Sequence, residues 1–405
     1  MSFRALAAFR VRSYRFQWPA DLATSWAFEM ETLILGWYVL VETQSVFLLS
    51  VFAALQFGGT LISPYVGTLA DRISRRRLLL GLRAMYALAA LLFAVLGLTD
   101  RLEPWMVFAI GIAVGLVRPS DLVVRNSLIG DTVPEADLPS AMGLSRTTMD
   151  SARIAGALAG AGLISTIGFG GSYAVVTAFY LCSIGLTAGV APGVERAAGS
   201  AWVQLKFGLQ FVIETPRIRA MMCLAFLVNL TAFPLSHGLL PYVAKNVYGT
   251  DATGLGHLMA AYAIGAMVGS IGLAIVGGTR HATRVVVVFI MLWYAILLVF
   301  AQSDSKNAGI VILALVGLAQ SMAMISMSVA LLVATKPEVR GRVMGVRMLA
   351  VYGLPLGLMA GGALAEQIGF AAQASLYSVI GLLATAAMAY RWRRFLWHGT
   401  RPASP

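Results

Sequence analysis

The chain has 405 residues, of which 59% are hydrophobic and only 12% are charged, and its mean hydropathy is +0.80. Soluble domains carry about twice that share of charged residues, so this composition excludes an ordinary soluble domain. The formal net charge is +12, but the basic residues lie between apolar segments rather than in one stripe, which argues against nucleic-acid binding.

Twelve segments are apolar and long enough to cross a bilayer, which takes roughly 20 residues of helix. We expect transmembrane helices at residues 17–41, 45–69, 78–98, 104–124, 138–166, 172–190, 218–243, 253–276, 283–301, 308–334, 339–366 and 370–391. No cleavable signal is expected, because the first apolar segment continues into a full span. The sequence therefore predicts an all-α membrane protein.

Basic residues lie almost entirely on one side of the predicted bilayer. An even number of spans puts both termini on one side, and 25 of the 30 Lys and Arg residues then lie on that side. Three lie on the opposite side, and Arg118 and Arg153 fall within predicted spans. Because Lys and Arg accumulate in cytoplasmic loops, we expect both termini to be cytoplasmic.

Three short motifs occur twice, in the same order and 201 to 203 residues apart. The first copies begin at Pro134, Gly156 and Ile167, and the second copies begin at Pro337, Gly357 and Ile368. This offset predicts two homologous six-helix bundles, at residues 1–192 and 218–405. Residues 193–217 are expected to form a cytoplasmic linker with a helix along the membrane surface. The Gly-x-x-x-Gly motifs that start at Gly156 and Gly357 predict close helix packing.

The connection between the second and third predicted helices reads GTLADRISRRR, from Gly67 to Arg77. This combination of glycine, one aspartate and clustered arginines resembles the signature loop of the major facilitator superfamily of secondary transporters. The resemblance implies the major facilitator fold, with 12 transmembrane helices in two pseudo-symmetric bundles and a substrate site between them. It also implies that the loop gates the cytoplasmic side, with the aspartate facing the start of the eleventh helix. The expected gate residues are Gly67, Asp71, Arg72, Arg75 and Arg76.

Two further stretches narrow the resemblance. Residues 37–45 read WYVLVETQS and residues 340–345 read RGRVMG, and both look like the bacterial branch that includes the enterobactin exporter and related drug/proton antiporters. The resemblance implies a multi-pass protein of the bacterial cytoplasmic (inner) membrane, driven by the proton gradient and without a cofactor. A monomer is expected, because no segment beyond the bundle itself indicates an association surface. Antiporters of the superfamily usually carry Gly-Pro in the fifth helix, whereas here Gly156 is followed by Ala157.

The first predicted helix carries a polar stripe. Asp21, Ser25, Glu29, Thr32 and Gly36 are spaced as i, i+4, i+8, i+11 and i+15, which places them on one face. Glu29 lies about 12 residues into the span, at a depth of ~18 Å and therefore near the midplane. A carboxyl group at this depth is costly unless it faces a cavity or another ionisable group, so Glu29 is a candidate functional residue. We expect Glu29 to carry the coupling proton, and a static ion pair with an arginine is the alternative.

Two sets of charged residues occupy the fourth and fifth helices. Arg118, Asp121 and Arg125 share one helical face, and Arg146, Asp150 and Arg153 share another. The simplest arrangement interlocks the two sets in a buried network, which either switches between two arrangements or locks the bundle. Asp121 and Asp150 are further candidates for proton coupling. Arg118 and Arg153 are candidates for binding an anionic substrate group, because guanidinium suits carboxylate and phosphate.

The C-terminal half offers fewer candidates. Asn229 and His237 in the seventh predicted helix, and Gln320 and Met324 in the tenth, are expected to line the substrate cavity. Methionine adapts to apolar ligands, although methionine stripes also occur in ordinary packing. His237 is either a hydrogen-bonded residue of the span or a proton relay.

These observations predict an alternating-access transporter that exports a small organic molecule, such as a drug, siderophore or metabolite, in exchange for protons. Its partners would be that substrate and the lipid bilayer. A proton-coupled importer of a small organic anion is the alternative within transport, and a receptor or membrane-embedded enzyme is the alternative from another class. No HExxH or Ser/His/Asp arrangement favours an enzyme, and no Cys/His cluster favours a metal site.

Overall fold

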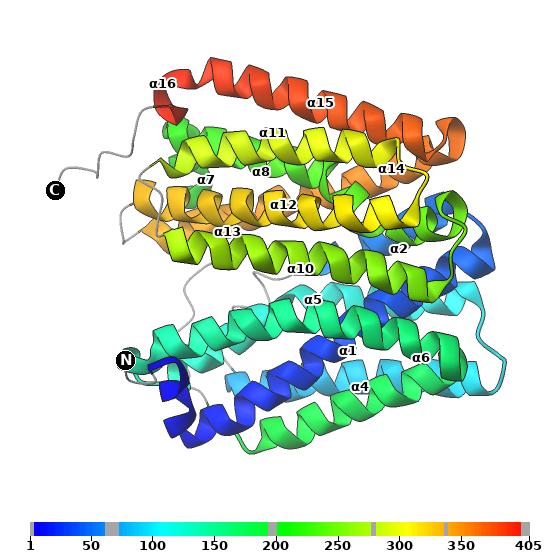
Figure 1. Cartoon of the computed structure of the whole chain (residues 1–405). Coiled ribbons are helices and arrows are strands. Elements are labelled where there is room, and N and C mark those ends of the chain that lie inside the picture. Colours follow the sequence, from blue (N-terminus) through cyan, green and yellow to red (C-terminus); the bar gives the residue numbers. More distant parts are fainter. Residues whose placement is uncertain (1–3, 61–72, 193–200, 277–280, 336–338, 398–405) are drawn as a thin grey trace. The chain divides into compact units, whose positions relative to one another are not determined.

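The computed structural model describes residues 4–60, 73–192, 201–276, 281–335 and 339–397, and these residues contain helices and connections but no β-strand (Figure 1). Within them, nine helices are long and apolar enough to cross a membrane. One of the nine is α6 (Leu138–Ala188), which contains two of the predicted spans. The expectation of an all-α membrane protein is therefore confirmed.

The chain divides into two compact units. Unit 1 comprises residues 1–44 and 55–201, and unit 2 comprises residues 45–54 and 202–405. Unit 1 contains η1 (Arg4–Arg10), α1 (Arg12–Thr43), η2 (Gly58–Thr60), α4 (Arg75–Leu98), α5 (Pro104–Thr132), η3 (Glu135–Asp137) and α6. Unit 2 contains α2 (Val46–Leu55), which ends at the boundary, α7 (Ala201–Glu214), α8 (Pro216–Thr231), η4 (Pro234–Gly238), α9 (Leu240–Tyr242), η5 (Val243–Val247), α10 (Ala252–Val276), α11 (Ala282–Ala301), α12 (Lys306–Ala334), α13 (Arg340–Leu349), η7 (Ala350–Tyr352), α14 (Gly353–Ile368), α15 (Phe370–Arg391) and α16 (Arg393–Leu396).

Helix α1 covers the first predicted span but is not among the nine apolar helices. Its carboxylates at Asp21, Glu29 and Glu31 lower its hydropathy. Of the second predicted span, 45–69, the structure describes only the part up to residue 60, which includes α2 and η2. Helix α1 is therefore more polar than the nine apolar helices, although it covers a predicted span.

The sharp turns between neighbouring helices occur at equivalent positions of the repeat. Gly168 has φ +70° and divides α6 into the two predicted spans. Gly369 has φ +80° and separates α14 from α15. Glycine adopts this left-handed region without the steric cost of a β-carbon. The two residues are 201 positions apart, so the repeat seen in the sequence corresponds to the same turn in both units.

The two Gly-x-x-x-Gly motifs pack as predicted. A β-carbon on Gly156 would lie 2.6 Å from Cβ of Glu29 in α1, and one on Gly357 would overlap the carbonyl oxygen of Leu230 in α8. Glu29 and Leu230 are also 201 residues apart. Each unit therefore packs its fifth helix closely against its first helix at the same level.

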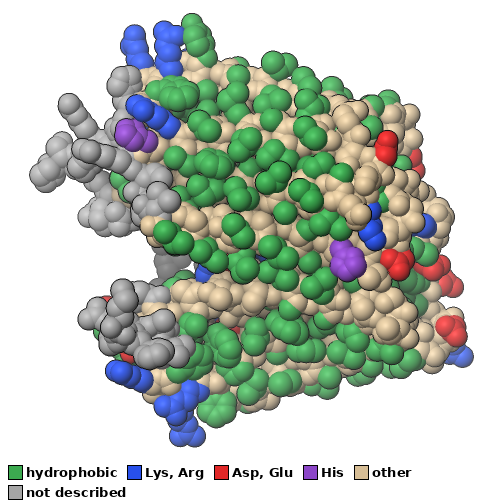
Figure 2. All heavy atoms as spheres, viewed as in Figure 1, with side chains coloured by type: hydrophobic (Ala, Val, Ile, Leu, Met, Phe, Trp, Pro, Cys, Tyr) green, Lys and Arg blue, Asp and Glu red, His purple; other side chains and the backbone are tan. Residues whose placement is uncertain are grey.

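Apolar side chains cover the outer flanks of the helices. Figure 2 shows hydrophobic side chains along the helix flanks, whereas most charged side chains lie toward helix ends. Leu88, Ile275 and Leu383 are among the large apolar residues that are more than 60% exposed. An apolar surface of this extent is suited to lipid contact rather than to water.

Outside the spans, Asp251 caps the N-terminus of α10. Its Oδ1 accepts a hydrogen bond of 3.0 Å from the backbone N–H of Gly254. This hydrogen bond is the main cause that lowers the pKa of the Asp251 carboxyl, and partial desolvation opposes it. Because the pKa is lower in the folded state, the stabilisation is present above the unfolded pKa of ~3.9 and is lost as the pH falls through the folded pKa.

Replacing Asp251 by Ala should therefore lower the free energy of unfolding by about 1 kcal/mol at pH 7, the usual contribution of a helix cap. The difference from the wild type should shrink as the pH falls below ~4. Thermal unfolding of the purified chain in detergent measures both effects. Asp304→Ala is the matched control, because the N-cap of α12 is Ser305 rather than Asp304. Equal losses in the two variants would refute the capping role.

Candidate functional site

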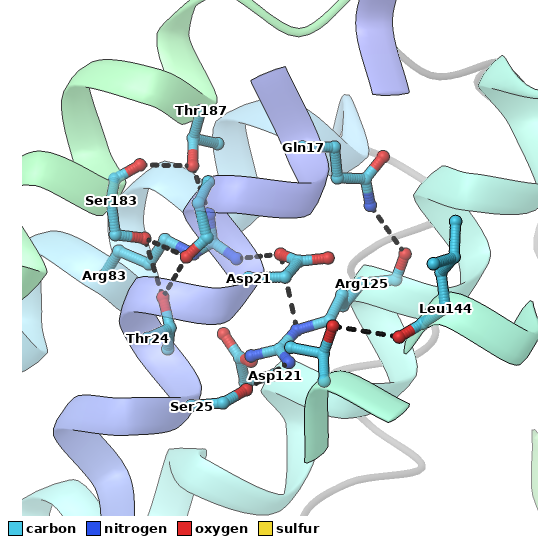
Figure 3. A network of polar contacts seen from close by, with 12 residues as sticks. Gln17, Asp21, Thr24, Ser25, Arg83, Asp121, Arg125, Leu144, Ser183 and Thr187 are labelled. Carbon is cyan, nitrogen blue, oxygen red and sulfur yellow. Dashed lines mark hydrogen bonds and ion pairs between the residues drawn. The ribbon is translucent and has the colours of Figure 1, made fainter. Parts of the chain in front are cut away.

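A buried charge network connects the helices of unit 1 (Figure 3). It consists of Asp21 in α1, Arg83 in α4, and Asp121 and Arg125 in α5, and none of the four is more than 4% exposed. Arg83 forms an ion pair with Asp21. Arg125 Nη2 lies 2.7 Å from Asp121 Oδ1, and Arg125 Nε lies 3.4 Å from Asp21 Oδ1, the oxygen that also pairs with Arg83. Two carboxylates and two guanidinium groups leave the network neutral overall, as burial in a membrane requires.

Neutral side chains complete this network. Arg125 donates to the hydroxyl of Ser25 at 3.0 Å, and Gln17 donates to the carbonyl oxygen of Arg125 at 3.1 Å. Arg83 donates to the hydroxyl of Thr187 in the second half of α6. The network thus joins α1, α4, α5 and α6 through hydrogen bonds to charged groups, which are the stronger kind.

The predicted interlocking of the two charged sets is wrong in its partners. Arg125 does bond Asp121 within α5, but across helices it pairs with Asp21 of α1. The described ion pairs of Arg153 likewise join it to α1 and to its own helix. The reason is geometric, since helix α1 lies against both α5 and α6 and offers its carboxylates to each of them.

Arg83 and Arg125 are among the 25 Lys and Arg residues expected on the cytoplasmic side, but neither of them lies in a loop. Both are buried inside helices. In the sequence, Arg83 follows Leu78 to Leu82 and precedes a further apolar run. A single arginine within an apolar segment is the signal that could have identified it as an internal partner of a carboxylate.

A second charged set lies nearer the surface of unit 1. Arg153 Nε lies 3.8 Å from Glu29 Oε1, and Arg153 Nη1 lies 3.9 Å from Asp150 Oδ1. Arg146 Nε bonds Asp150 Oδ2 at 3.1 Å. The side chains of Glu29 and Arg153 are 27% and 34% exposed. Glu29 is therefore held loosely by one arginine, in contrast to the tightly bonded Asp21 and Asp121.

Arg118 in α5 has only neutral partners among the described residues. Its Nη2 donates to the carbonyl oxygen of Phe28 at 2.8 Å and to Thr32 Oγ1 at 3.1 Å, and its Nη1 donates to Gln56 Oε1 at 3.1 Å. Its guanidinium carbon lies 4.3 Å from the centre of the Phe28 ring. Arg118 is thus a half-buried cation held in place without a carboxylate.

Glu31 lies about 200° around α1 from Glu29, at ~100° per residue, and faces a neighbouring helix. It is 4% exposed, and its carboxyl accepts a hydrogen bond from the hydroxyl of Tyr180 in α6. The ring of Tyr180 lies 5.7 Å from that of Tyr86 and 5.9 Å from that of Phe28. Glu31 is therefore a buried carboxyl group in an aromatic pocket, and it was not among the expected site residues.

The expected gate residues are only partly described. Gly67, Asp71 and Arg72 lie outside the described residues. Arg75 forms an ion pair with Asp131 at the end of α5, and Arg76 donates to the carbonyl oxygen of Val190 at 2.9 Å. These two arginines connect the start of α4 to the ends of α5 and α6.

The expected cavity residues of unit 2 occupy α8, η4 and α12. The amide of Asn229 donates to the carbonyl oxygen of Ala225, one turn earlier in its own helix. His237 is exposed on the π-helical turn η4, with its ring 4.7 Å from that of Tyr262. Gln320 and Met324 lie one turn apart on α12, and both are half-buried. Helices with π-turns often carry functional residues, which keeps His237 a candidate.

The chain is similar to one known family and to several solved structures. The family described as "Transmembrane secretion effector" matches residues 3–400. A bacterial homologue of the human lysosomal transporter Spinster superimposes with a TM-score of 0.75 at 13% identity, covering 96% of this chain and 99% of the other. PepTSo, a transporter of the POT family, gives a TM-score of 0.72 at 12% identity, with coverage of 96% and 99%.

The human organic anion transporter MFSD10 (TETRAN) gives a TM-score of 0.66 at 15% identity, covering 93% of this chain and 99% of the other. No curated protein matches the sequence. At these identities the likeness to solved structures is one of fold.

Proposed function

Because the chain belongs to the transmembrane secretion effector family of the major facilitator superfamily, we propose that it exports a small organic molecule across the membrane in exchange for protons. Membership in a transporter family makes transport, rather than an enzymatic reaction, its activity. The direction, the coupling to protons and the kind of substrate are the proposal. Export is supported by the description of the family.

We further propose twelve transmembrane helices in two bundles, with both termini in the cytoplasm of a bacterial inner membrane. Nine apolar helices, the division of α6 at Gly168, the polar helix α1 and the segment that begins with α2 support this number. The one-sided distribution of Lys and Arg supports the orientation. A substrate site between the bundles is typical of this class of transporter.

The observation that carries the proton coupling is the loose ion pair of Glu29. A proton carrier must exchange its partner, and Arg153 holds Glu29 at only 3.8 Å in a partly exposed setting. Asp121 is less suitable, because Arg125 holds it at 2.7 Å with almost no exposure. Asp150 is intermediate, since it contacts both Arg146 and Arg153. Protonation of Glu29 would release Arg153, and such a change in an ion pair can bias which side of the transporter is open.

The substitution Glu29→Gln should abolish substrate-induced proton movement, because glutamine keeps the shape of the side chain but cannot release a proton. A growth screen against dyes, siderophores and antibiotics first identifies a substrate. The proton movement that this substrate induces is then measured in everted membrane vesicles with a pH-sensitive dye. Glu42→Gln is the matched control, since Glu42 is exposed near the end of the same helix. Unchanged proton movement in Glu29→Gln would exclude Glu29 as the carrier.

A second candidate function is proton-coupled import of a small organic anion. It is favoured by Arg118, a half-buried cation whose described partners are all neutral. One protein of similar fold is described as an organic anion transporter. The direction of proton movement on addition of substrate separates the candidates, because export by exchange and import by joint movement give opposite signs in everted vesicles.

A further inference from the structure

Arg118 of α5 is hydrogen-bonded to α1 at a point between the carboxyl groups of Glu29 and Glu31. Arg118 is anchored at Phe28 and Thr32, which lie about 40° apart on a helix with 3.6 residues per turn. Glu29 and Glu31 then lie about 80° to either side of the midpoint of these anchors. The positive charge of Arg118 acts on both carboxyl groups.

The charges around the middle of α1 balance only when both carboxyl groups are ionised. The three carboxylates Glu29, Glu31 and Asp150 then match the three guanidinium groups of Arg118, Arg146 and Arg153. Glu31 has no cation within 4.0 Å among the described residues, and its bonding partner is a tyrosine hydroxyl. An unpaired carboxylate buried to this extent is costly, whereas the protonated form is not. When Glu31 holds a proton, one positive charge is left over at Arg118.

We propose that Arg118 binds a carboxylate group of the transported substrate, and that this site accepts the carboxylate when Glu31 is protonated. The inference rests on the second candidate function, proton-coupled import, because a proton and an anion that bind together also move together, and it names the substrate class. The ionised Glu31 and the substrate carboxylate compete for the same compensating charge. Proton binding and anion binding therefore strengthen each other.

The chemistry of Arg118 suits a carboxylate on an apolar body. Of its five N–H donors, three have described acceptors, at Phe28, Thr32 and Gln56. The donors that remain are Nε–H and one Nη1–H, and a carboxylate oxygen that accepts from either one forms a charge-assisted hydrogen bond. The Phe28 ring beneath the guanidinium supplies an apolar contact beside the charge. A small carboxylic acid with an aromatic or aliphatic body fits these features.

The groups that face Glu31 are few and can be named for each element packed against it. Helix α6 contributes Tyr173 and Tyr180, and helix α5 contributes Arg118. Helix α4 contributes Tyr86 through its packing on Tyr180. On α1 itself the nearest ionisable residue is Glu29. Among these groups, Arg118 is therefore the only one with a permanent charge, and this charge compensates Glu31 when Glu31 is ionised.

The test measures binding of matched ligands to the purified full-length chain in lipid nanodiscs. The probes are benzoate, phenylacetate and octanoate, each compared with its primary amide, which has the same shape but no charge. Calorimetry in buffers of different ionisation enthalpy counts the protons exchanged. At least one carboxylate should bind more tightly than its amide, with uptake of a proton, and its affinity should fall tenfold per pH unit where Glu31 is ionised in the free protein.

Three variants separate the roles. Arg118→Gln should remove the preference for carboxylate over amide, whereas Arg101→Gln, an exposed loop residue with the same charge change, should keep it. Glu31→Gln, which imitates the protonated side chain, should bind the carboxylate with no dependence on pH. If Glu31→Gln does not fold, Tyr180→Phe removes the single described hydrogen bond of Glu31 and should shift the pH dependence without removing the carboxylate preference.

Equal binding of carboxylates and amides, release of a proton on binding, or a retained preference in Arg118→Gln would overturn the inference. Failure of the proposed function looks different. In that case the carboxylate binds with proton uptake, but a substrate gradient moves no protons across proteoliposomes. A positive result in both experiments supports import, because joint binding of proton and anion drives uptake along an inward proton gradient.

Discussion

Replacing Arg83 by Met is expected to lower the free energy of unfolding by about 3–5 kcal/mol, because removing one partner of a buried ion pair leaves the other charge uncompensated. Arg83 is 0% exposed and pairs with Asp21. Without it, the network holds two carboxylates and only one guanidinium group. Fluorescence-detected size-exclusion chromatography after heating in detergent measures the loss as a lower melting temperature and a lower folded yield.

Two further variants identify the cause of this loss. Arg146→Met removes the same charge from α6, but its side chain is 53% exposed, so the expected cost is below about 1 kcal/mol. The double variant Asp21→Asn/Arg83→Met restores neutrality and should recover part of the stability. If Arg83→Met and Arg146→Met lose the same amount, the buried network does not stabilise unit 1 as described.

Replacing Gly265 by Val is expected to cost about 3 kcal/mol, because the added side chain meets backbone that cannot move aside. A β-carbon on Gly265 of α10 would overlap the carbonyl oxygen of Ala314 in α12, and one on Gly317 of α12 would overlap that of Tyr262. The two helices therefore meet through reciprocal glycines. Thermal unfolding of the purified variant measures the effect.

The control for this substitution lies in the same helix. A β-carbon on Gly272 would meet no atom within 4 Å, so Gly272→Val should change the stability little. Unit 1 has an equivalent close contact. A β-carbon on Gly115 would overlap the carbonyl oxygen of Leu55, and Gly115 lies 202 residues before Gly317. Similar melting temperatures for Gly265→Val and Gly272→Val would contradict the close approach of α10 and α12.

Much of the fold could be predicted from the sequence because glycine and apolar patterns act locally. The repeated Ile-Gly-Phe motif marks two real turns, at Gly168 and Gly369, since their positive φ combined with a ψ near 180° is a backbone conformation found almost only in glycine. The Gly156 motif likewise predicts close packing because a missing β-carbon leaves room. The reciprocal glycines at Gly265 and Gly317 were missed, since single glycines in apolar helices carry no pattern of their own.

The partners in the candidate site could be predicted only in part. The polar stripe of α1 is real, but it divides between two clusters, with Asp21 and Ser25 in the buried network and Glu29 and Thr32 on the more exposed side. Which arginine meets which carboxylate depends on the rotation of each helix about its axis, and the sequence does not encode this rotation locally. For the same reason, the pairing of Arg83 with Asp21 and the burial of Glu31 among aromatic rings could not be predicted.

The central claim is that movement of the substrate is coupled to a proton carried by ionisable groups within the membrane. The most direct test uses proteoliposomes that contain the purified chain and a trapped pH-sensitive dye, with a substrate gradient and equal pH on both sides. The account predicts that the internal pH changes with the wild type and stays constant with Glu29→Gln. Substrate that crosses the membrane while the wild-type internal pH stays constant would contradict it.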